Sequence, residues 1–124
     1  MTDPLALVCY ERLLPGSQLV NRLQDLGYRV HALADVGELA VCATEQKPLV
    51  VLVDLHYEHA DVCAAIARLR QDPRTAHLPV IAFAGERETG LQAAAQAAGA
   101  TVVVSETRLL AHLGALLEQA LQVE

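Results

Sequence analysis

The chain has 124 residues, the size of one domain, and 53% of them are hydrophobic, which is enough for a core. Its net charge of −6 argues against nucleic-acid binding, because such surfaces need clustered basic side chains. The apolar stretches are shorter than the roughly 20 residues that cross a bilayer, and the first residues lack the basic region of a signal peptide. The sequence therefore predicts a cytoplasmic protein with no membrane association, one domain over residues 1–124 with its core at about 5–122.

The first half of the chain alternates apolar runs with helical patterns. Residues 5–10 form a continuous apolar run, typical of a strand buried on both faces. A helical apolar face follows and ends before Gly27; its members are Leu19, Val20, Leu23 and Leu26. Residues 28–33 alternate like a strand that is less fully covered, and a capping box at residues 35–38 opens a helix to about residue 46.

The second half continues this alternation. Residues 49–55 are β-branched and almost wholly apolar, which predicts the most buried strand. The next helix has Val62, Ile66 and Leu69 on its inner face and must stop before Pro73. Residues 78–84 then predict a fourth buried strand.

An alanine-rich helix over residues 88–98 is closed by Gly99. Residues 101–105 predict the fifth strand, and a leucine-rich helix runs from about Arg108 to Leu121. We expect its inner face to be Leu109, Leu113, Leu116 and Leu117.

Five strands, each followed by a helix, predict an α/β fold with a doubly wound parallel sheet, because parallel strands need right-handed crossover connections. In such sheets functional groups gather outside the carboxyl ends of the strands. The residues at those ends are Tyr10, Glu11, Asp54, Ala84, Gly85, Ser105 and Glu106.

These positions resemble, in type and spacing, the receiver domain of two-component response regulators. Without gaps, Glu11, Gly27, Asp54, Ala84 and Glu106 stand at that family's acidic pair, first helix stop, phosphoacceptor, hydroxyl and lysine positions. The segment RLRQDPRTAHLPVIAFAG is also similar to the family's third-helix-to-fourth-strand segment. The resemblance implies a flavodoxin-like receiver fold with five strands in the order 2-1-3-4-5 and five helices.

The resemblance also implies the chemistry of Asp54. In the family a histidine kinase transfers a phosphoryl group to this Asp, an acidic pair helps it to hold Mg²⁺, and a hydroxyl and a Lys contact the phosphoryl oxygens. Carried over, Asp54 is the phosphoacceptor position, and Glu11 with Asp54 would hold Mg²⁺. Tyr10, Ala84 and Glu106 replace the first acid, the hydroxyl and the Lys, so the set is degenerate.

The charge reversal at Glu106 weighs most. A cation about 4 Å from a phosphoryl group contributes several kcal/mol at an effective dielectric near 20, and a carboxylate opposes binding by a similar amount. We therefore expect a poor or non-functional phosphoacceptor, unless an arginine (Arg12, Arg87 or Arg108) supplies the cation. Two alternatives stay open for Glu106, a pocket group or a solvated residue at a helix start.

Tyr10, Val103 and the loop after Asp54 also bear on the site. Tyr10 is interpreted as a plug in the space of the metal rather than as a functional hydroxyl. Val103 replaces the family's aromatic switch residue, so with Ala84 both switch partners are missing. The loop with His56, Glu58, His59 and Asp61 is interpreted as a polar loop, with a transition-metal site as the alternative.

The three cysteines, Cys9, Cys42 and Cys63, are odd in number and include no CxxC pair. Each lies in an apolar run, so we expect reduced thiols in the core. A redox role is the alternative.

The sequence thus predicts a non-enzymatic, receiver-like signalling module of a bacterial two-component phosphorelay. Its expected partner is a protein: a histidine kinase, a phosphotransfer protein or a downstream target, with homodimerisation left open. The alternative is a phosphorylation-independent pseudo-receiver that serves as a docking or dimerisation domain. A small-molecule or redox sensor that uses the vacated pocket or the thiols is a further alternative.

Overall fold

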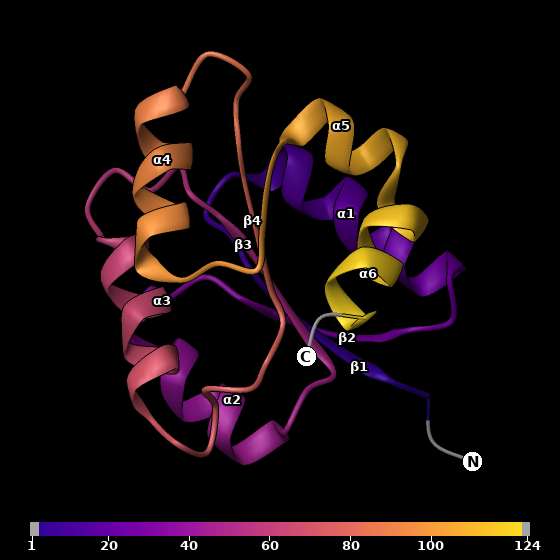
Figure 1. Ribbon diagram of the computed structural model, residues 1–124. Helices are drawn as coiled ribbons and strands as arrows, with labels where there is room; N and C mark the ends of the chain where they lie inside the picture. The colour runs from indigo at the N-terminus through magenta and orange to yellow at the C-terminus, as the bar shows by residue number, and fades with distance from the viewer. Residues whose placement is uncertain (1–2, 123–124) are drawn as a thin grey trace.

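A parallel five-stranded sheet forms the centre of the computed structural model, which describes residues 3–122 (Figure 1). The strand order is β2-β1-β3-β4-β5, which confirms the predicted topology. The strands are β1 (Leu5–Cys9), β2 (Arg29–Leu33), β3 (Val50–Asp54), β4 (Val80–Ala84) and β5 (Val102–Ser105).

Helices cover both faces of this sheet (Figure 1). In the described residues they are α1 (Leu13–Asp25), α2 (Leu39–Gln46), α3 (Val62–Gln71), α4 (Thr89–Ala98), α5 (Glu106–Ala111) and α6 (Leu113–Gln122), with a 3₁₀ turn η1 (Val36–Glu38) before α2. Helices α2, α3 and α4 lie on one face, and α1, α5 and α6 lie on the other (Figure 1). No helix within residues 3–122 is long and apolar enough to cross a membrane.

The prediction of a single last helix, and with it the count of five helices, is wrong. The helix begins at Glu106 and is divided at His112, whose φ of −129° and ψ of 32° leave the helical region. Ser105 sets the early start, because its side chain accepts a hydrogen bond from the Arg108 N–H at 3.2 Å. Gly114 just after the break is a weak helix former. The four leucines of the predicted inner face are nevertheless buried.

Two apolar layers, one on each face of the sheet, form the core. Ile66 and Leu69 of α3 pack on one face and Leu19 and Leu23 of α1 on the other, all fully buried. Because β1, β3 and β4 are covered on both sides, every residue in these strands is buried. Leu26, predicted to be on the buried face of α1, is 50% exposed, because α1 ends at the residue before it.

Two glycines end helices as predicted. Gly27 follows α1 with φ of 92°, and Gly99 follows α4 with φ of 112°. Both values lie in the left-handed region that glycine adopts without a Cβ penalty. These sharp stops return the chain to the sheet in time for β2 and β5.

The cysteines are free, and they differ in burial. Cys9 is fully buried at the end of β1, and burial raises the pKa of its thiol to about 11. Cys42 and Cys63 are only half-buried at the edge of the core, which corrects the expectation of three core thiols.

Candidate functional site

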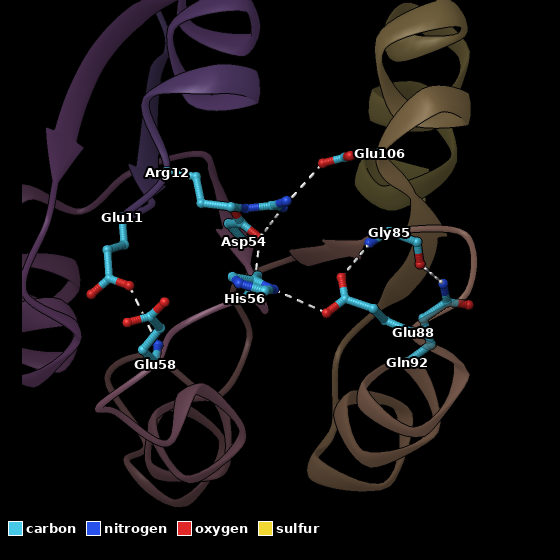
Figure 2. Close-up of polar contacts among 9 residues, drawn as sticks. All are labelled: Glu11, Arg12, Asp54, His56, Glu58, Gly85, Glu88, Gln92 and Glu106. Carbon is cyan, nitrogen blue, oxygen red and sulfur yellow. Dashed lines mark hydrogen bonds and ion pairs between the residues drawn. The ribbon is translucent and has the colours of Figure 1, made fainter.

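Asp54, at the expected phosphoacceptor position, is the last residue of β3 and its side chain is fully buried. Its Cα pairs with that of Phe83 in β4, and Ala84 at the end of β4 pairs with Ser105 in β5. Parallel strands end at one edge of the sheet, so the segments that follow them converge. Figure 2 shows side chains from these segments meeting around Asp54.

Arg12, from the segment between β1 and α1, covers Asp54. Its Nε donates to Asp54 Oδ2 at 2.9 Å and its Nη2 donates to Asp54 Oδ1 at 2.8 Å. This is the two-pronged geometry that makes arginine–carboxylate pairs strong. The hydrogen bond to Asp54 raises the pKa of Arg12. Both oxygens of the candidate phosphoacceptor are therefore engaged by one guanidinium group.

Glu106 completes a three-residue clamp. As the first residue of α5 it begins a helix, and its Oε2 also accepts a hydrogen bond from Arg12 Nη2 at 3.0 Å (Figure 2). Its side chain is 29% exposed and paired with Arg12, which favours the interpretation as a pocket group over that of a solvated residue at a helix start. Arg12 lies between two carboxylates. Its positive charge is paired with the negative charge of Glu106, which stands at the expected lysine position.

Only one of the three arginines proposed from sequence lies in the pocket. Within residues 3–122, Arg87 and Arg108 form no ion pair, whereas Arg12 forms two. Arg12 has an extended backbone, with φ of −78° and ψ of 125°, and precedes the first residue of α1. Its position directly after Glu11 indicated that Arg12 lies near the strand ends. The spacing alone could not show which way its side chain points.

Tyr10 does not cover Asp54. Its ring is half-buried against the core layer under α1, where it fills the space that a side chain on Gly16 would need. The predicted plug is therefore misplaced, and the guanidinium of Arg12 is the group that covers the carboxylate.

The donors near Asp54 do not fit a magnesium ion, which needs several oxygen ligands in near-octahedral geometry. Glu11 is exposed and its Oε1 accepts from the Glu58 N–H at 3.3 Å, on the side away from Asp54 (Figure 2). Tyr10 supplies no carboxylate, and Arg12 holds both oxygens of Asp54. In the described part of the chain, no three His, Cys, Asp or Glu side chains lie together as a metal site would require.

At the two expected switch positions, Ala84 is fully buried and Val103 is half-buried. Neither side chain has a polar group. A hydrogen-bond network that the sequence did not reveal lies beside them. Glu88 Oε1 accepts from the Gly85 N–H at 2.8 Å, and Glu88 Oε2 lies 3.0 Å from His56 Nδ1. The hydrogen bond with His56 and then that from Gly85 lower the pKa of Glu88.

The other polar residues of the loop after β3 point to separate partners. Asp61 caps α3 by accepting from the Ala64 N–H at 3.0 Å. His59 is 90% exposed and only approaches Glu58, at 3.9 Å. This dispersal agrees with the interpretation of a polar loop.

Comparisons with known proteins identify the class of fold. No family model and no curated protein sequence matches the chain, whereas its structure is similar to solved receiver domains. A protein described as a response regulator from Chloroflexus aurantiacus gives a TM-score of 0.89 at 20% identity, covering 98% of this chain and 100% of that one. A chemotaxis response regulator of Vibrio cholerae gives 0.82 at 19% identity, covering 96% and 99%.

The receiver domain of a sensor histidine kinase from Pseudomonas aeruginosa gives a TM-score of 0.87 at 20% identity, covering 98% of this chain and 100% of that one. A magnesium ion is coordinated in the active site cleft of that protein. The chain therefore has the receiver fold, as its sequence predicted.

Proposed function

We propose that this chain is a receiver-type signalling module that acts by binding a protein partner and does not depend on phosphorylation of Asp54. The observation that carries the proposal is the two-pronged hydrogen bond from Arg12 to both oxygens of Asp54. It favours the pseudo-receiver alternative over an active phosphorelay component.

The chemistry of phosphoryl transfer supports this choice. The carboxylate must present a free oxygen to the phosphorus, while a metal ion and a cation meet the charge of the transferring group. Here Arg12 occupies the carboxylate, and Glu106 would face the phosphoryl oxygens with a negative charge. The donors around Asp54 and Glu11 also argue against a magnesium ion, so no step is assigned to one.

The fold supports a protein as the partner. Similar domains come from a sensor histidine kinase and from a chemotaxis response regulator. A groove of about 550 Å³ lies along β5, with lining residues that include Gln92, Gln96, Val103, Arg108 and Gln119. Because β5 is an edge strand of the sheet, this side offers both side chains and backbone to a partner. A kinase, a phosphotransfer protein, a downstream target and a second copy of the chain are the candidates.

The direct test is incubation with Mg²⁺ and acetyl phosphate, followed by intact mass measurement. We expect no stoichiometric gain of a phosphoryl group in the wild type, so neither it nor Asp54→Asn should show the added mass. Rapid gain in the wild type alone would contradict the proposal. In that case the chain would be an active receiver whose Arg12 moves aside.

A further inference from the structure

His56 and Glu88 join the loop after β3 to the loop after β4. The contact is between His56 Nδ1 and Glu88 Oε2, at 3.0 Å, and the two side chains are 42% and 29% exposed. The second oxygen of Glu88 accepts from the N–H of Gly85, the first residue after β4, at 2.8 Å. One carboxylate therefore spans the two loops (Figure 2).

The same network holds the start of α4. Glu88 is the residue directly before that helix, and Gln92, one turn in, donates from Nε2 to the Gly85 carbonyl at 3.0 Å (Figure 2). Gly85 thus donates to Glu88 and accepts from Gln92. The hydrogen bonds of Glu88 and Gln92 to Gly85 both hold the first turn of α4. A shift of Glu88 would therefore also move the start of this helix.

At its other end the network reaches Asp54. The backbone N–H of His56 donates to Asp54 Oδ1 at 3.0 Å, and this is the oxygen that accepts from Arg12 Nη2 at 2.8 Å. Removal of Arg12 would leave the His56 N–H as the remaining donor to that oxygen among the described residues. Residue 56 therefore shares an acceptor oxygen with Arg12 through its backbone and contacts Glu88 through its side chain.

We propose that Glu88 is a positioning residue that couples the Arg12–Asp54 pocket to helix α4 through His56. It supplies a polar connection that Ala84 and Val103, with neither a hydroxyl nor an aromatic ring, cannot form. The inference rests on the proposed function, because it takes the clamp as the resting state. It adds the route by which a partner that displaces Arg12 would move α4 and the groove beside β5.

The test measures backbone amide NMR shifts in nitrogen-15-labelled protein. Arg12→Ala is introduced into the wild type and into a Glu88→Ala background. In the wild type we expect it to shift amide signals along α4, from Gln92 onward; with Glu88→Ala most of that shift should be lost. His56→Ala, which keeps its backbone bond to Asp54, should also remove the transmitted shift.

Two variants separate coupling from a general effect on structure. Glu88→Gln keeps an oxygen for Gly85 and gains an amide for His56. It should therefore restore transmission, by which we mean the shift of α4 amide signals that Arg12→Ala causes. Glu86→Ala removes an exposed carboxylate from the same loop and should leave transmission unchanged. If Arg12→Ala does not fold, Asp54→Asn weakens the same clamp and serves in its place. Equal α4 shifts with and without Glu88 would overturn the proposal.

The phosphorylation assay distinguishes this failure from failure of the proposed function. A chain that gains a phosphoryl group but loses transmission in Glu88→Ala would contradict phosphorylation independence and support the coupling. A chain that gains none and transmits equally in both backgrounds would support the function and reject the coupling.

Discussion

Two half-buried arginines at opposite ends of the sheet use the same group differently. Arg12 lies at the carboxyl ends of the strands, against Asp54 and Glu106. Arg70, on α3, lies at the other end and donates to the carbonyls of Gly99, Ala76 and Leu78 and to Thr101 Oγ1, at 2.7 to 3.0 Å. Arg70 forms hydrogen bonds to neutral groups, mostly backbone carbonyls, whereas Arg12 neutralises part of the charge of two carboxylates.

The pKa directions reflect this contrast. Burial lowers the pKa of Arg70, because neutral carbonyls compensate only in part for lost water. The hydrogen bond to Asp54 raises the pKa of Arg12. Burial alone therefore does not distinguish a structural arginine from one in a candidate site; the charge of its partners does.

The largest effect is expected at Arg70. Arg70→Ala removes four hydrogen bonds and leaves two part-buried carbonyls and one exposed carbonyl without that donor. We expect it to lower the free energy of unfolding by about 3 kcal/mol. Urea denaturation measures this, with Arg74→Ala as the control, because Arg74 is 71% exposed and pairs with Asp72 at the surface. Equal losses of unfolding free energy for the two variants would contradict a structural role for Arg70.

Arg12→Ala should cost somewhat less, roughly 2 kcal/mol, because Asp54 keeps the His56 N–H and Glu106 is part-exposed. Arg12→Lys should lie between, since an ammonium cannot form the two-pronged bond. The exposed Arg108 offers the matched control. A loss no greater than that of Arg108→Ala in urea denaturation would show that the clamp contributes nothing to stability.

Exchanging the clamp for the family's cation should change reactivity more than stability. Arg12→Ala combined with Glu106→Lys frees Asp54 and returns a cation to the lysine position. We expect the double variant to be about 1 kcal/mol less stable than the wild type and to gain a phosphoryl group from acetyl phosphate and Mg²⁺ faster. No increase over the wild type in intact mass would show that Arg12 and Glu106 are not the obstacle.

The smallest effect concerns pH. The pKa of Glu88 is lowered from 4.5 by its hydrogen bonds, so its contribution to stability is present above that pH. It is lost as the pH falls through the lower folded-state pKa. Thermal melts from pH 6 downward should therefore decline less steeply in Glu88→Gln, which keeps the hydrogen bonds but does not titrate there. Identical slopes would refute this contribution.

The strands and the position of Asp54 could be predicted because buried parallel strands are continuous apolar runs. The division of the last helix at His112 could not, since the leucine periodicity continues through it. The site was predictable as a set of strand ends, but not as a clamp. Arg12 is one of three arginines near those ends, and its direction depends on the extended backbone before α1.

The network around Glu88 was missed for a similar reason. Its residue types are ordinary for polar loops, and the approach of His56 to Glu88 depends on how two loops fold back over neighbouring strands. Tyr10 was misplaced because an aromatic residue at a strand end can turn toward either the pocket or the core. Gly16 leaves a space in the core that the ring fills.

The clamp itself is tested most directly by the NMR signal of the Arg12 Nε–H. If this group donates to Asp54, its signal should be resolved, shifted downfield and slow to exchange with water, and Asp54→Asn should weaken these features. A wild-type Arg12 signal at the position of an exposed arginine, unchanged in Asp54→Asn, would contradict the clamp and return Asp54 to the status of an available phosphoacceptor.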